Sequence, residues 1–198
     1  YKNKLFLGLN LNAHFTDYVK STSVYESNNN ELYTSGLTVT DIQFNNDLYT
    51  YGTGFSMNLG AIYKFTDNFR AGIAYESPTW YQLNDELSQR LITRTSDGTN
   101  IRQRDINPQI INIYESYKIQ TPSKWTLSGA YIFGKKGLIS VDYATKDYSN
   151  IKFKPTNDSF FSDLNSQMRS QFKNAMELRI GGEYKIKQWS LRGGYQFE

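Results

Sequence analysis

Charged side chains occupy alternate positions near the end of this 198-residue chain. Between residues 177 and 185 they share one side of an extended backbone, because successive side chains of a strand point to opposite faces. A planar guanidinium binds a carboxylate through two parallel hydrogen bonds, so Arg179 or Arg192 can bind an acidic ligand. The same charges can instead form salt bridges that only satisfy one another. With two earlier segments they form the densest charged set: Arg70, Glu76, Glu177, Arg179, Glu183, Lys185 and Arg192.

Residue types that carry catalysis or bind metals are scarce. The chain has no cysteine, which excludes disulfides, thiolate nucleophiles and cysteine-ligated metals, and its one histidine, His14, cannot build a multi-histidine zinc site. Asp142 has no serine and histidine in a recognisable triad arrangement. The net charge of +3 is spread along the sequence and gives no nucleic-acid footprint. We therefore expect no enzymatic activity, cofactor, metal site or nucleic-acid partner, and interpret His14 as a polar residue that faces a lumen.

The elements that position these charges are predicted to be β-strands. From Met176 to Ile186 every apolar side chain falls on one face and every charge on the other, which is the period of a pleated strand rather than of a helix. A similar alternation recurs along the chain, with Phe6 as an exception. It predicts seven strands, at residues 5–15, 55–65, 69–76, 125–133, 139–143, 176–186 and 191–197.

The connections between these strands are of two kinds. Tight turns are predicted at 66–68, 134–137 and 187–188, where Asp, Asn and Gly suit such turns. Long polar loops are predicted at about 20–49, 84–110 and 154–173. Short and long links alternate, and aromatic residues gather at the tight-turn end. Short periplasmic turns, long extracellular loops and an aromatic girdle are typical of outer-membrane barrels.

Alternating strands also occur in soluble β-sandwiches and lipocalin-like barrels, whose apolar face turns inward. Exposing seven apolar faces to water would leave a patch far larger than soluble monomers tolerate. Strands of 9–11 residues also suffice to cross a bilayer. We therefore predict an all-β fold, a transmembrane antiparallel β-barrel with lipid outside and charge inside. Seven strands cannot close such a barrel, so the chain is expected to be partial.

Residues 159–172 are predicted to form an amphipathic helix within the third long loop. Phe161, Leu164, Met168 and Phe172 follow three- and four-residue spacing, and Ser159 can cap the start. This helix can be a lid that captures ligand or a loop packed over the barrel mouth. Two prolines, Pro78 near the end of one strand and Pro122 within another, each remove a ladder donor, which indicates a bulge or a kink in the wall.

Several segments resemble the FadL-type transporters of hydrophobic compounds. They are Gly54–Phe65 with Thr66-Asp67-Asn68-Phe69 and Ala71–Pro78, then Thr121-Pro122 through Leu127–Tyr131 to Val141-Asp142-Tyr143, and finally Glu177–Tyr184 with Leu191–Tyr195. The resemblance implies a 14-stranded barrel plugged by an N-terminal hatch, which carries long-chain fatty acids or similar molecules inward. It also implies a capture groove among extracellular loops, an interior pocket and sideways release through the wall.

On this resemblance, residues 1–198 form one partial β-barrel domain without the hatch and the closing strands. We expect passive transport of hydrophobic small molecules across the outer membrane of a Gram-negative cell, with the bilayer and a hydrophobic ligand as partners. A FadL-like barrel that serves as a scaffold or docking subunit of a larger outer-membrane secretion complex is the alternative. Candidate residues are Arg70, Glu76, Arg179 and Arg192 in the lumen, and Phe161, Leu164, Met168 and Phe172 for ligand capture.

Overall fold

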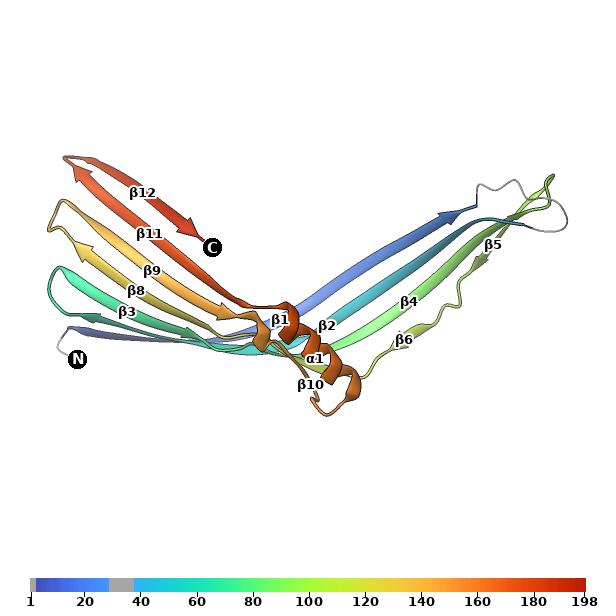
Figure 1. Ribbon diagram of the computed structural model, residues 1–198, viewed down its shortest axis with the longest axis horizontal. Helices are drawn as coiled ribbons and strands as arrows, with labels where there is room; N and C mark the ends of the chain where they lie inside the picture. Colours follow the sequence, from blue (N-terminus) through green and yellow to red (C-terminus); the bar gives the residue numbers. More distant parts are fainter. Residues whose placement is uncertain (1–2, 29–37) are drawn as a thin grey trace. The chain divides into compact units, whose positions relative to one another are not determined.

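The computed structural model describes residues 3–28 and 38–198, and most of them are in β-strands (Figure 1). The strands belong to one sheet, and every strand pair whose register is given is antiparallel. A 3-10 turn, η1 (Tyr148–Asn150), and one helix, α1 (Ser159–Gln171), interrupt it. The strands are β1 Leu5–Ser27, β2 Thr38–Lys64, β3 Phe69–Glu76, β4 Trp80–Ser96, β5 Ile101–Ile106, β6 Ile111–Ile113, β7 Tyr117–Gln120, β8 Lys124–Ile132, β9 Gly137–Asp147, β10 Lys152–Lys154, β11 Asn174–Ile186 and β12 Trp189–Phe197.

The chain divides into two compact units. Unit 1 contains residues 1–14, 53–82 and 117–198, and unit 2 contains 15–52 and 83–116. In unit 1 the strand order runs from β1 through β2, β3, β8, β9 and β11 to β12. Each of the seven predicted strands corresponds to one of these elements, so their prediction is confirmed, although the ranges 55–65 and 125–133 each run one residue past the end of the observed strand. The five strands that the sequence did not predict are β4, β5, β6, β7 and β10.

The three predicted tight turns are confirmed, and they share one end of unit 1 (Figure 1). The first turn closes with a hydrogen bond of 3.0 Å from the Phe65 N–H to the Phe69 carbonyl, and the second with one of 2.8 Å from Phe133 to Gly137. In the third, Lys187 adopts a φ of 52°, the left-handed conformation that tight turns demand. We call this edge of unit 1 the tight-turn end.

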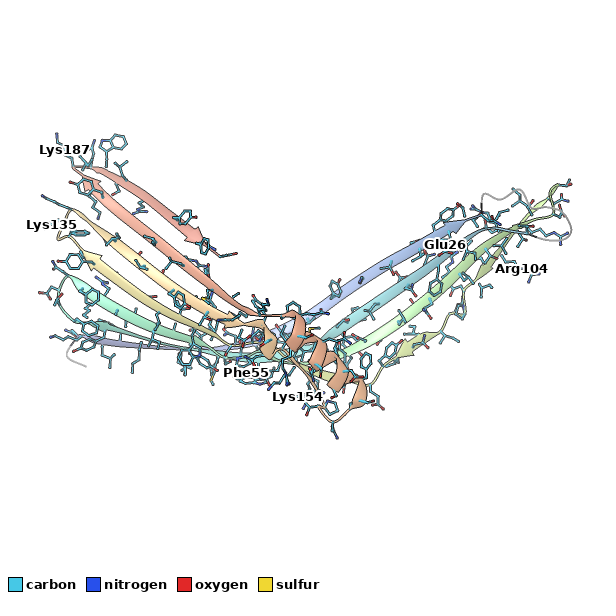
Figure 2. All side chains as sticks on the ribbon, viewed as in Figure 1. Glu26, Phe55, Arg104, Lys135, Lys154 and Lys187 are labelled. Atoms are coloured by element: carbon cyan, nitrogen blue, oxygen red, sulfur yellow. The ribbon has the colours of Figure 1, made fainter. Side chains whose placement is uncertain are left out.

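The two faces of unit 1 differ in chemistry. In the register, one cross-strand row joins Tyr63, Ala71, Gly129, Val141, Ile180 and Tyr195, and its side chains belong to what we call the apolar face. Rows one residue away carry the charges and small residues, which we call the charged face. Leu178 and Ile180 are 37% and 40% exposed, and Phe55, labelled in Figure 2, is 47% exposed. Of the hydrophobic residues that the structure describes, only Leu83 and Ala144 are buried. The sheet therefore lacks the dry protein core that a soluble sandwich requires.

Unit 2 corrects the prediction of long irregular loops. Within the predicted loops 20–49 and 84–110, residues 20–27, 38–49, 84–96 and 101–106 are strands, while 29–37 lie outside the described residues. Polar side chains join neighbouring strands here: the Gln89 amide donates to Asn46 and the Thr50 hydroxyl to Asp85, both at 2.7 Å. In the third loop, 154–173, α1 follows β10.

Two prolines mark breaks between strands. Pro78 separates β3 from β4, and Pro122 separates β7 from β8, so Pro122 does not lie within a strand as the sequence suggested. The Met57 N–H donates to the Ser77 hydroxyl at 2.9 Å, and the Thr79 N–H donates to the Thr121 hydroxyl at 2.8 Å. Side-chain oxygens thus replace ladder acceptors at both breaks. Among the helices of the described residues, none has the length and apolar character to span a membrane.

Candidate functional site

The charged face of unit 1 gathers residues from four neighbouring strands. The register places Glu76 opposite Lys124, and Asp142 opposite Arg179. Glu177 forms ion pairs with Lys124, at 3.5 Å, and with Arg179. Its side chain is only 16% exposed, less than those of its partners Lys124 (26%) and Arg179 (51%). The sequence pattern placed Glu177 on this face, but it missed Lys124, which begins a strand and has no alternating neighbours before it.

The predicted guanidinium ligands are already paired with carboxylates. Arg179 contacts Glu177, and the Arg192 Nε lies 3.1 Å from Glu183. Glu183 also forms an ion pair with Lys185, whose Nζ lies 3.7 Å from the Glu183 Oε1. Of the four predicted lumen residues, Glu76 and Arg179 lie on the same face, on either side of the cross-strand row that contains Glu177, while Arg192 pairs separately with Glu183.

The fourth predicted residue, Arg70, lies beside a hollow on the charged face. The hollow has a volume of about 490 Å³ and is floored by small residues, because glycine, alanine and serine occupy most of the facing positions of five neighbouring strands. Phe6 and Ile62 add apolar side chains on a face that is otherwise polar, which explains the exception at Phe6 in the alternating pattern. Arg70 and Asp142 contribute its charged groups, and no ion pair of Arg70 is found in the described part of the chain. The small lining residues are Gly8, Gly60, Gly72, Ala74, Ser128, Ala130 and Ser140.

His14 belongs to a separate polar group. Its Nε2 lies 2.8 Å from the hydroxyl of Ser56, which is 5% exposed, and its ring lies 5.7 Å from that of Tyr81. The Tyr81 ring also covers Gly54, where an added Cβ would lie 2.5 Å from its Cδ1 atom, so this position requires glycine. The pair between His14 and Ser56 explains how a polar ring is accommodated on the charged face.

The predicted helix is confirmed: it starts at Ser159, as predicted, and ends at Gln171, one residue before the predicted end, but its cap is a different residue. The cap is Asp158 rather than Ser159, because the Asp158 carboxylate accepts a hydrogen bond of 3.1 Å from the Phe161 N–H. A buried amide, Asn165, bonds the N–H and the carbonyl of Phe153 at 2.7 and 2.9 Å, which fixes α1 to β10.

The four predicted capture residues of α1 differ in exposure. Phe161 stacks on Phe153 with ring centroids 6.0 Å apart. Leu164 and Met168 are half-buried, whereas Phe172 is 42% exposed. Phe160, which the helical spacing did not select, is 70% exposed. The aromatic side chains that a ligand can reach are therefore Phe160 and Phe172.

Unit 2 carries charges on both faces of its strands and shows perturbed acidities. A bidentate contact from Arg90 lowers the pKa of Asp105, and the carboxylate in turn raises the pKa of Arg90. Desolvation raises the pKa of Tyr49, and the neighbouring Asp17 carboxylate acts in the same direction. These groups make an ordered polar surface on unit 2.

Comparison with known families decides the membership of the chain. The profile of the family described as outer membrane protein transport protein (OMPP1/FadL/TodX) matches residues 3–198. The chain belongs to this family. FadL-type proteins reside in the outer membrane of Gram-negative bacteria and are transporters rather than enzymes. The apolar face of unit 1 is accordingly the lipid-facing side of a transmembrane β-barrel wall.

Two solved structures resemble this FadL-type chain. The toluene transporter TbuX of Ralstonia pickettii is 16% identical with a TM-score of 0.53, and the alignment covers 98% of this chain and 51% of TbuX. The toluene transporter TodX of Pseudomonas putida is 15% identical with a TM-score of 0.46, covering 96% and 63%. The chain thus spans about half the length of TbuX. No curated protein matches it.

Proposed function

We propose that the FadL-type protein containing this wall carries hydrophobic small molecules passively across the outer membrane, long-chain fatty acids among them. The observation that supports this most is the hollow of about 490 Å³ on the charged face. A charged lumen surface is hydrated, so an apolar solute that enters it exposes its apolar surface to water, which is unfavourable. In the hollow, such a solute can contact the apolar side chains of Phe6 and Ile62 and the surrounding small residues.

The distribution of charge suggests which solutes fit. Arg179 and Arg192 are compensated by glutamates, so binding an acid there would first break an ion pair. Arg70 borders the hollow without such a partner among the described residues. We propose that neutral hydrocarbons rest on the apolar floor, and that a fatty acid adds a contact between its carboxylate and Arg70. The toluene named for TbuX and TodX belongs to the neutral class.

Uptake by cells provides the test. The full-length protein is expressed in a strain without its own FadL-type transporter, and entry of radiolabelled toluene and of oleate is measured. Ala74→Trp fills the hollow and should reduce entry of both compounds. The matched control is Ala13→Trp, which adds the same ring on the apolar face. Arg70→Gln should reduce oleate entry while toluene entry is retained.

Equal uptake by the wild type and Ala74→Trp would contradict the role of the hollow. No uptake of either compound by the wild type, together with co-purification of a secretion complex, would favour the scaffold function instead.

We further propose that α1 contributes to ligand capture through Phe160 and Phe172, because these are the aromatic side chains of the helix region that remain accessible. Phe161, Leu164 and Met168 then serve to hold the helix in place. Replacing Phe160 and Phe172 together by Ser should lower uptake at limiting toluene concentrations and leave uptake at saturating concentrations unchanged.

A further inference from the structure

A second hollow, of about 550 Å³, opens on the apolar face close to the tight-turn end. Its floor is the register pair Gly182 and Gly193, where two adjacent strands present no side chain. Ile139 lines it in the same cross-strand row as the two glycines, and Phe133, Tyr184 and Leu191 line it toward the tight-turn end. The result is an apolar groove in the lipid-facing surface, separate from the hollow on the charged face.

The end of this groove is surrounded by lysines. Lys135 and Lys136 lie in the β8–β9 turn and Lys187 in the β11–β12 turn; Figure 2 shows Lys135 and Lys187 at this same end. The β8–β9 turn contacts the end of β11, two residues before Lys187, because the Lys185 N–H donates to the Lys136 carbonyl at 2.7 Å. Lys185 is paired with Glu183, whereas no ion pair of the three turn lysines is found in the described residues.

Aromatic side chains fix the level of these lysines in the membrane. Tyr184 and Trp189 stand beside the turns, 54% and 70% exposed, as expected of a girdle at the boundary between hydrocarbon and headgroups. The lysines lie in the turns just beyond this girdle, and therefore at the level of the lipid phosphates. An uncompensated positive cluster at that level attracts anionic headgroups.

We propose that this groove is a binding site for one anionic glycerophospholipid. An acyl chain lies over Gly182 and Gly193, and the phosphodiester contacts Lys136 and Lys187. A free phosphate ion would gain nothing from the groove, and a neutral lipid would gain nothing from the lysines, so the two features together select this class. The site does not depend on which compound the barrel carries.

Native mass spectrometry of the full-length protein in neutral detergent tests the proposal. Phosphatidylglycerol and phosphatidylcholine with identical acyl chains are added at equal concentration. The wild type should retain phosphatidylglycerol preferentially, and Lys136→Gln with Lys187→Gln should weaken its binding roughly fivefold for each lysine removed. Lys152→Gln with Lys154→Gln removes the same charge from β10 and should leave binding unchanged.

Filling the groove provides the second arm. An added Cβ at Gly193 meets no atom within 4 Å, so Gly193→Leu is compatible with the strand and should weaken retention of both lipids. Inorganic phosphate at millimolar concentration should not displace phosphatidylglycerol. Equal retention of both lipids by the wild type, or unchanged binding in the lysine and Gly193→Leu variants, would overturn the proposal.

Discussion

Replacing Ser77 by alanine should destabilise the barrel wall at the break between β3 and β4. The Ser77 hydroxyl accepts a hydrogen bond from the Met57 N–H at 2.9 Å and donates one to the Pro78 carbonyl at 2.8 Å. It accepts from the Met57 N–H in place of a backbone carbonyl, at the point where the ladder is interrupted. Alanine keeps the backbone and removes only this oxygen.

The expected magnitude follows from burial. Ser77 is 5% exposed, so water cannot readily replace the lost acceptor. Leaving a buried donor unsatisfied costs about 1–3 kcal/mol, compared with a net value near 1 kcal/mol for a bond that water can replace. Thr121→Val removes the equivalent acceptor of the Thr79 N–H at the neighbouring break, but Thr121 is only half-buried, so water can reach this site more easily than it can reach Ser77. We therefore expect a loss of about 2 kcal/mol for Ser77→Ala and about 1 kcal/mol for Thr121→Val.

Urea unfolding of the full-length protein in lipid vesicles, followed by tryptophan fluorescence, measures both losses. Ser77→Thr retains a hydroxyl and should keep most of the wild-type free energy of unfolding. The reasoning is refuted if Ser77→Ala unfolds at the wild-type midpoint with the wild-type slope, or if Thr121→Val is the more damaging change.

Three further outcomes are expected. Ile180→Arg places a charge on the apolar face and should lower the free energy of unfolding by roughly 2–4 kcal/mol, measured in the same urea assay. Asn165→Leu removes both bonds to Phe153, so limited proteolysis should cut between residues 155 and 173 faster than in the wild type. The contact with Arg90 lowers the pKa of Asp105 below its ordinary 3.8, so its stabilising effect is complete above that value and disappears as the pH falls through the lowered pKa. The difference in unfolding midpoint between the wild type and Asp105→Asn should therefore be present at pH 6 and vanish at the lowest pH at which the barrel stays folded.

The wall strands could be predicted because one face of each must be apolar. Phe69–Glu76 matches β3 at both ends, and residues 176–186 fall two residues short of the start of β11. Met176 begins the apolar set, whereas Asn174 and Ala175 extend the ladder without contributing to the pattern. Hydrophobic alternation therefore locates the membrane-spanning part of a strand better than its ends.

The strands of unit 2 could not be predicted by the same signal. Residues such as Asp17 and Lys20 put charge on both faces of β1, so the alternation disappears in the part of β1 that belongs to unit 2. What stabilises these strands is pairing between residues far apart in sequence, such as Arg94 with Asp41 at 3.3 Å. Spacing within one segment carries no information about such partners.

Part of the candidate site also emerges only from the fold. The sequence placed Arg70, Glu177 and Arg179 on one face, but not Lys124, which pairs with Glu177 from a neighbouring strand. The net charge looked evenly spread, yet the turns bring Lys136 and Lys187 to one edge. Register, rather than composition, creates both the ion pairs and the lysine cluster.

The orientation of the two faces is the claim on which this account depends. Since the chain has no cysteine, single cysteines can be introduced along β11 of the full-length protein and labelled with a fluorophore in lipid vesicles. Labels at Leu178, Ile180 and Tyr184 should be quenched by lipid-borne quenchers, and labels at Arg179 and Glu183 by water-soluble ones. The opposite assignment, or quenching without alternation, would contradict a lipid-facing apolar side.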